Sequence, residues 1–117
     1  MKNRRIIGTE YEQKAAEYLT LQGYQILERN FRCRQGEIDL IAKEGEWLVF
    51  IEVKYRKTAG SGEPLEAVNQ RKQEKIYQAA RYYLHHFYYG QEIVCRFDVV
   101  AILGEEISLI RNAFGGI

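Results

Sequence analysis

The sequence contains little of what a disulfide-stapled or zinc-stapled protein needs. It has only two cysteines, Cys33 and Cys95, whereas a small secreted scaffold carries more of them at closer spacing. The cysteines do not form a CxxC pair, and the only two histidines, His85 and His86, are adjacent. We therefore expect no structural zinc, and we predict that both cysteines are free thiols in a reducing compartment.

Long apolar segments are also missing. No run approaches the roughly 18 apolar residues that a membrane-spanning helix needs. At the basic start, MKNRRIIG, only two apolar residues separate the arginines from Gly8, which is too few for the core of a signal peptide. These absences predict a cytoplasmic protein with no membrane partner.

Strong charge of either sign is absent as well. The net charge of +1 lacks the basic excess that is typical of nucleic-acid-binding proteins. Any one cluster of basic residues is typical of a solvated surface, whereas convergence of several clusters on one site would indicate function. The sequence has three such clusters: Arg29, Arg32 and Arg34; Lys54, Arg56 and Lys57; and Arg71, Lys72 and Lys75.

The composition that remains is that of an ordinary globular protein. The chain has 117 residues, of which 46% are hydrophobic and 28% charged, and this length predicts a single domain over residues 1–117. Thr9 with Glu12 fits a helical capping box, Gly23 fits a helix stop, and Pro64 suits the first position of a second helix. The patterns predict helices over 9–23 and 65–88 and strands over 24–30, 36–42, 47–56, 93–103 and 106–112. The expected fold class is therefore α/β, with a mixed sheet flanked by helices.

Two of the predicted strands form a hairpin around the loop at 43–46. If Ala42 faces Trp47 across this loop, Leu40 faces Val49 and Ile38 faces Ile51, which creates one apolar face. Side chains alternate along a strand, so the opposite face carries a different set. That set is Glu37, Asp39, Phe50, Glu52 and Lys54.

The charged face has the parts of a metal-dependent hydrolytic site. Asp39 and Glu52 would repel each other unless a cation lies between them, and Mg²⁺ prefers such oxygen ligands. Such a metal can generate a hydroxide nucleophile, and Lys54 can orient the attacking water or neutralise a phosphate. An ExK tripeptide alone is more typical of a solvated strand face, so this pattern indicates a site without establishing one.

Several motifs together resemble the YraN-like family of small bacterial proteins. They span nearly the whole chain: Gly8, Glu12 and Ala16; Asn30; GEIDLI at 36–41; FIEVKYR at 50–56; RFDVV at 96–100; and NAF at 112–114. The family is similar to archaeal Holliday junction resolvases and belongs with the restriction-endonuclease-like, PD-(D/E)xK fold. The proline of that motif is absent here, because Ile38 precedes Asp39.

The resemblance implies a role for each acidic residue of the site. It makes Asp39, Glu52 and Glu12 the ligands of Mg²⁺ or Mn²⁺, and it makes Asp39, Glu52 and Lys54 the catalytic residues. Glu12 keeps its alternative role in the capping box. The expected reaction is hydrolysis of phosphodiesters in DNA, in particular branched DNA, by a homodimer whose two sites cut two strands.

Basic residues near this site are candidates for phosphate contacts. Arg56 and Lys57 follow the catalytic strand, Lys72 lies on a helix stripe that is otherwise apolar, and Arg32 and Arg34 are weaker candidates. The alternative for Lys72 is a long stem that packs along the apolar stripe while its charge reaches water.

Two other features have a structural interpretation. Arg96 and Asp98 lie in an otherwise apolar strand and are expected to form an ion pair. The aromatic run YYLHHFYY at 82–89 is expected to pack in the core or against a second subunit, with base stacking as the alternative.

Two further functions compete with a nuclease. The chain could be a nucleic-acid-binding module on a nuclease-like scaffold, with weak or absent catalysis, or a protein-interaction domain. Metal binding distinguishes the first alternative from a nuclease, and a steep salt dependence of DNA affinity counts against the second.

Overall fold

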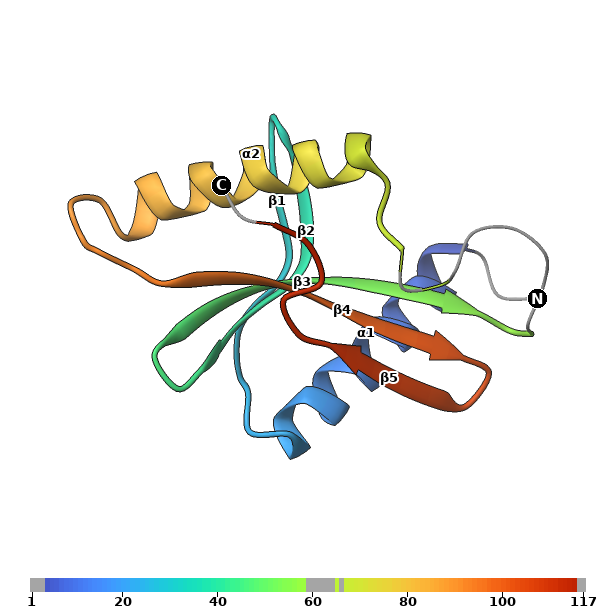
Figure 1. The fold of residues 1–117 in the computed structure, drawn as a ribbon. Helices are drawn as coiled ribbons and strands as arrows, with labels where there is room; N and C mark the ends of the chain where they lie inside the picture. The colour runs from blue at the N-terminus through green and yellow to red at the C-terminus, as the bar shows by residue number, and fades with distance from the viewer. Residues whose placement is uncertain (1–3, 59–64, 66, 116–117) are drawn as a thin grey trace.

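The elements follow one another in the predicted order, α-β-β-β-α-β-β (Figure 1). The computed structural model describes residues 4–58, 65 and 67–115, with side chains from residue 8 onward. Its elements are α1 (Arg4–Leu21), β1 (Gln25–Cys33), β2 (Gly36–Glu44), β3 (Trp47–Arg56), α2 (Gln70–Phe87), β4 (Cys95–Leu103) and β5 (Glu106–Ile110).

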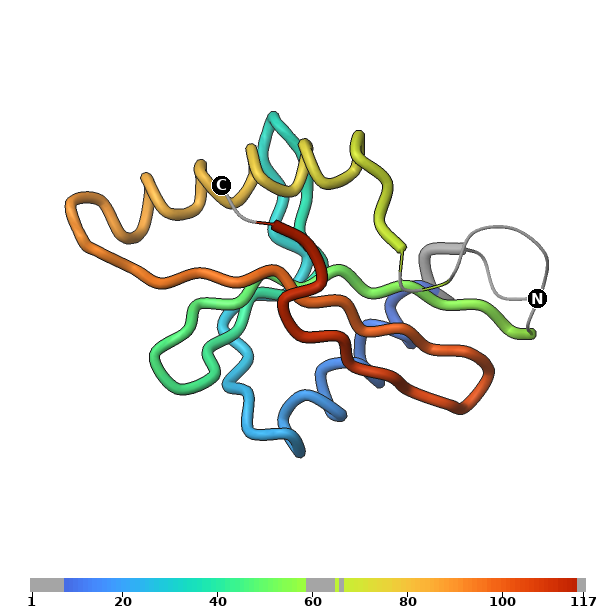
Figure 2. The backbone as a smooth tube through the Cα atoms, in the orientation of Figure 1, coloured from blue at the N-terminus to red at the C-terminus, as the bar shows by residue number. Residues whose placement is uncertain are grey.

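The strands form one mixed sheet in the order β1-β2-β3-β4-β5. Neighbouring strands are antiparallel except β3 and β4, which are parallel and are joined through α2. A parallel pair requires such a crossover, because the chain must return to the same end of the sheet. The two helices lie on opposite faces of the sheet (Figures 1 and 2). The predicted α/β fold class with a mixed central sheet is therefore confirmed.

The central strand β3 is buried on both faces. Val49 and Ile51 pack on the α1 side, whereas Leu48 and Phe50 pack on the α2 side. Four consecutive buried residues are typical of a strand that is covered by helices above and below. This double anchoring fixes the position of Glu52, the first residue of β3 beyond the buried run.

Both predicted helix starts were wrong. Helix α1 already includes Arg4, so Thr9 lies inside the helix and the capping box with Glu12 does not form. The helix continues through Gly8, so the local cap signal does not decide where it starts. Glu12 is thereby released for another role.

Helix α2 begins five residues later than expected. Asn69 caps it, because its side chain accepts a hydrogen bond from the Lys72 backbone N–H at 2.9 Å. Ala67 and Val68 are not helical, and their carbonyl groups accept hydrogen bonds from the side chains of Lys54 and Gln73. The predicted role of Pro64 falls outside the described residues.

The hairpin between β2 and β3 is tighter than predicted. Its connection has two residues, Gly45 and Glu46, and Gly45 adopts the left-handed conformation with φ 60°. Ala42 therefore pairs with Val49 instead of Trp47, a shift of two residues. A shift of two residues keeps every side chain on its predicted face.

Ile38 is the exception to the predicted face. It packs in the cluster on the α2 side, together with Ile76 and Phe50, instead of with Leu40 and Ile51. The pairing of β2 with β3 begins only at Leu40, so the preceding part of β2 twists away with β1 and lies beside α2 (Figure 1). The predicted face was wrong because the strand changes direction at Asp39.

The predicted ion pair of Arg96 and Asp98 is confirmed. Asp98 is fully buried and accepts hydrogen bonds from the Tyr24 hydroxyl at 2.7 Å, the Arg96 Nε at 2.9 Å and the Asn112 backbone N–H at 2.8 Å. Arg96 also contacts Glu44 at 2.6 Å. This network joins β2, β4 and the segment after β5, so its role is structural.

The remaining sequence predictions have mixed outcomes. Both cysteines are free, and the two histidines are exposed. In the aromatic run, Tyr83 is buried under α2 as predicted, whereas Phe87 and Tyr89 are exposed. Neither described helix combines the length and apolar character that a membrane span requires.

Replacing Asp98 with alanine should strongly destabilise the fold. The change leaves the partly buried Arg96 without its main partner, so we expect the free energy of unfolding to fall by about 3–5 kcal/mol. Urea denaturation measures this change, with Glu105→Ala in the exposed β4–β5 turn as the control. Equal midpoints for the two variants would contradict a structural role for the network.

Candidate metal and nucleic-acid site

The site begins where β2 and β3 separate. The regular pairing of these strands ends at Leu40 and Ile51, and an Asp39 carboxylate oxygen then accepts a hydrogen bond from the Val53 backbone N–H at 2.8 Å. The side chain thus continues the contact that the backbones no longer make. As a result, Asp39 lies directly beside Glu52.

Glu52 is held in an environment that is unfavourable for a negative charge. Its side chain is 10% exposed. Burial, followed by the adjacent Asp39 carboxyl group, raises the pKa of Glu52 well above its ordinary value. The Lys72 ammonium group, 3.5 Å from a Glu52 oxygen, offsets only part of this shift. The acid pair therefore favours either a bound proton or a further cation.

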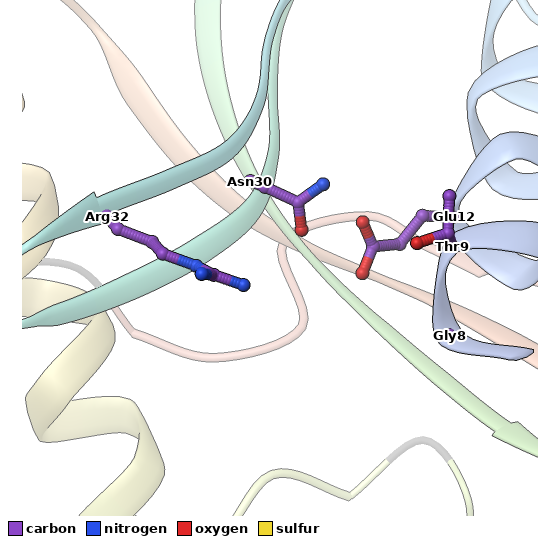
Figure 3. Close-up of a pocket in the computed structure, with 5 residues that line it drawn as sticks. All are labelled: Gly8, Thr9, Glu12, Asn30 and Arg32. Carbon is purple, nitrogen blue, oxygen red and sulfur yellow. The ribbon is translucent and has the colours of Figure 1, made fainter. Parts of the chain in front are cut away.

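Glu12 approaches the same region from α1. Figure 3 shows its carboxylate pointing across a gap toward Asn30 on β1, and Arg32 reaches into the same space. These three residues, with Gly8 and Thr9, line a pocket of about 360 Å³. Burial and the charge of Asp39 raise the pKa of Glu12.

One Glu12 oxygen, Oε1, is buried and has no hydrogen-bond partner. A buried carboxylate oxygen without a partner is costly, because its interactions with water are lost and not replaced. This oxygen can serve as the acceptor for a ligand or an ion. A bound ligand or ion would offset this cost. Binding therefore accounts for an acid at position 12, whereas the predicted capping box does not form.

The acids fit a hydrated Mg²⁺ or Mn²⁺ better than a fully enclosed ion. In the described part of the chain, no group of three or more His, Cys, Asp or Glu side chains is close enough to hold a metal by itself. Mg²⁺ is commonly held by one or two carboxylates plus waters and substrate phosphates, which the Asp39–Glu52 pair can provide. The repulsion within this pair and the unpartnered Glu12 oxygen both favour a cation.

The two lysines near Glu52 have different partners. Lys54 donates a hydrogen bond to the Ala67 carbonyl at 2.6 Å, which ties β3 to the segment before α2. Lys72 forms the ion pair with Glu52, so its ammonium group lies at the site. The alternative, in which this group only reaches into water, does not describe it. Lys72 was predicted as a phosphate contact near the site, with packing of its stem along the apolar stripe as the alternative, and it lies beside Glu52.

The other predicted phosphate contacts divide into two groups. Arg32 lies beside Glu12 and also forms an exposed ion pair with Glu37 at 3.2 Å, whereas Arg34 lies in the exposed β1–β2 turn. Arg56 is the last residue of β3, roughly 13 Å along the strand from Glu52, and Lys57 follows it. The first and third basic clusters therefore converge near the acid pair through Arg32 and Lys72.

Sequence reasoning missed Asn30 as a member of the site. Asn30 has φ 52° and lies between Arg29 and Phe31, whose partners on β2 are the two neighbours of Asp39. Asparagine tolerates the left-handed conformation better than most residues, but this tendency alone does not reveal a functional position. Only the packing of β1 against α1 brings Asn30 to Glu12.

Comparison with known proteins places the chain in a family. The sequence model of the Uncharacterised protein family UPF0102 matches residues 11–102. The chain belongs to this family. The match covers the acid pair, Glu12 and both lysines, and it confirms the resemblance to YraN-like proteins.

Similar proteins align along nearly the whole chain. The UPF0102 protein of Lachnoclostridium phytofermentans is 52% identical over 112 residues, which cover 96% of this chain and 95% of the relative. The UPF0102 protein FN1370 of Fusobacterium nucleatum is 46% identical over 114 residues, covering 97% and 95%. The UPF0102 protein of Caldicellulosiruptor saccharolyticus is 42% identical over 118 residues, covering 96% and 99%.

The raised pKa of Glu52 predicts a specific pH dependence of stability. Relative to Glu52→Gln, the wild-type free energy of unfolding should fall as the pH rises above 4.5, the ordinary pKa of this group. The folded protein keeps a proton that the unfolded chain has lost, so higher pH favours the unfolded chain. Urea denaturation with a chelator at about pH 5 and about pH 8 measures the difference between the two proteins. A difference that is the same at both pH values would contradict the environment described for Glu52.

Proposed function

We propose that this protein is a metal-dependent nuclease that hydrolyses phosphodiester bonds in branched or structured DNA. The observation that carries the proposal is the contact between Asp39 and Glu52, two partly buried carboxyl groups. Lys72 lies beside Glu52, and Glu12 is close enough to Asp39 for the charge of Asp39 to raise its pKa. This combination is costly for stability and useful for holding a divalent cation next to a phosphate.

Each residue has a distinct role in the proposed reaction. Asp39 and Glu52 would hold Mg²⁺ or Mn²⁺. Glu12 would approach from α1 as a further carboxylate, although in the described structure it does not form a three-acid group with them. A bound metal of this kind supplies a water of lowered pKa and stabilises charge on the phosphate. Lys54 orients the attacking water, and its hydrogen bond to the Ala67 carbonyl keeps its ammonium group on the same side of β3 as the acids. Lys72 balances the charge of Glu52.

The choice of substrate comes from the family resemblance and from the basic residues. Similarity to Holliday junction resolvases supports branched DNA, and a homodimer would place two sites on two strands. Arg32, Arg34, Arg56 and Lys57 are proposed to contact backbone phosphates, which position DNA without reading its sequence. A cytoplasmic location is part of the same proposal.

A cleavage assay with matched variants tests the proposed activity. Purified protein is incubated with four-way junction, flap and duplex DNA in the presence of Mg²⁺ or Mn²⁺. We expect Asp39→Asn, Glu52→Gln and Lys54→Ala each to reduce the rate by about 100-fold or more, because each removes a group that acts on the metal or the water. Glu105→Gln, which changes an exposed acid in the β4–β5 turn, should cut at the wild-type rate. Equal cutting by wild type and all three site variants would overturn the assignment.

A nucleic-acid-binding module without catalysis is the second candidate function. It is favoured by the lack of a three-residue metal group among the described residues. Metal binding separates the two candidates, because only the nuclease requires an ion at the acid pair.

Addition and removal of Mn²⁺ should change the stability of proteins that keep the acid pair intact. Binding to the folded state raises the unfolding temperature, and the rise grows with metal concentration. We expect this rise for the wild type and for Glu105→Gln, reversal by chelator, and its loss in Asp39→Asn. If calorimetry detects no metal uptake while DNA binding is intact, the binding module is the better description.

A further inference from the structure

A second pocket adjoins the acid pair on the side of α2. It has a volume of about 290 Å³ and lies where the β1–β2 hairpin approaches the beginning of the helix. Its lining residues are Arg32, Cys33, Gly36, Glu37, Lys72 and Lys75. None of these is aromatic, so the pocket offers charge and no surface for base stacking.

The pocket carries an excess of positive charge. Three of its residues, Arg32, Lys72 and Lys75, are cationic, and Glu37 is its one acid. The Arg32–Glu37 ion pair is solvent-exposed, with 62% and 50% of the two side chains accessible. Exposed ion pairs contribute little, so Arg32 can exchange Glu37 for a phosphate at small cost.

Two of the cations also belong to the acidic site. The Lys72 ammonium group is 3.5 Å from a Glu52 oxygen, and Arg32 lines the pocket that contains Glu12. The basic pocket is therefore separated from the proposed metal position by single side chains. A ligand in this pocket would be a direct neighbour of the phosphate at the acid pair.

Gly36 allows the pocket to have this shape. A Cβ atom at this position would lie 3.0 Å from the Lys75 carbonyl oxygen, which is tighter than nine in ten real Cβ contacts. The hairpin can therefore pack directly against the first turns of α2. This close approach lets Arg32 and Lys75 line the same pocket.

We propose that this pocket binds a backbone phosphate of the nucleic-acid strand, next to the phosphate at the acid pair. The inference rests on the proposed function and specifies its substrate class: a chain with at least two successive phosphates, not an isolated phosphodiester. Lys75 is assigned here as a phosphate-binding residue. Because the pocket contacts phosphate alone, it positions the strand without selecting a sequence.

Equilibrium binding without metal tests the pocket independently of catalysis. A fluorescent single-stranded DNA oligonucleotide is titrated with protein in chelator at several salt concentrations, with anisotropy as the readout. The variants are Lys75→Gln, Glu37→Gln and Arg81→Gln. Arg81 is an exposed control on the same helix, six residues beyond Lys75 and outside the lining of the pocket.

The three variants should respond differently. Lys75→Gln should weaken binding and reduce the slope of log affinity against log salt by about 0.7, the value for one lost phosphate contact on a single strand. Glu37→Gln should strengthen binding several-fold, because it removes the acid that competes for Arg32. Arg81→Gln should leave both affinity and slope closer to those of the wild type than Lys75→Gln does.

Two results would overturn the proposal. The first is that Lys75→Gln and Arg81→Gln have equal affinity and equal salt slope. A wild type that does not bind the oligonucleotide counts as the same result. The second is weaker binding by Glu37→Gln, because an acid that helps binding indicates a cation site or a hydrogen-bonding role.

Cleavage of four-way junction, flap and duplex DNA with Mn²⁺, measured beside binding of the oligonucleotide, separates this inference from the proposed function. A wild type that binds through Lys75 and never cuts would overturn the nuclease and leave the pocket in place. A wild type that cuts while Lys75→Gln binds equally well would overturn the pocket and leave the nuclease in place.

Discussion

The hydrogen bond from the Val53 backbone N–H to the Asp39 carboxylate determines the arrangement of the site. It forms at the point where β2 stops pairing with β3 and turns with β1 toward α2. Without it, the two strands would separate with their charged side chains apart. With it, one carboxylate is fixed beside another, and the diverging hairpin leaves space for Arg32 and Lys72 to approach from either side.

The acid pair depends on the stability of its surroundings. Two adjacent carboxyl groups, one of them largely buried, oppose folding when both are charged. The chain tolerates this cost because β3 is anchored on both faces and because the Asp98 network ties β2, β4 and the C-terminal segment together. The packed core next to the site thus offsets the repulsion between the two carboxyl groups and holds them in place, as a preorganised ion site requires.

The sequence predicted the order of the elements and the charged face, but not the directions of the chain at its bends. Alternation along a strand placed Asp39 with Glu52 correctly even though the hairpin register was shifted, because a shift of two residues preserves the faces. Ile38 was placed on the wrong face because the strand twists there, and twist is decided by packing against α2. The start of α2 at Gln70 depends on a cap by Asn69, which was overlooked in favour of Pro64.

Contacts between distant elements were beyond the reach of local patterns. Glu12 fitted a capping box in sequence, but in three dimensions it faces Asn30 and feels the charge of Asp39. Lys72 fitted an apolar stripe and ion-pairs with Glu52. In both cases the sequence correctly marked an unusual residue, and the fold decided its partner. Charge clusters that are separate in the sequence became neighbours for the same reason.

The most direct measurement of the central claim is the position of a bound metal. A crystal grown with Mn²⁺ and measured near the manganese absorption edge would locate the ion through its anomalous scattering. The account predicts one strong peak in contact with both the Asp39 and the Glu52 carboxylates, and no peak there in crystals of Asp39→Asn. Crystals of the wild type in which Asp39 and Glu52 remain in direct contact, with Mn²⁺ bound elsewhere or not at all, would contradict it.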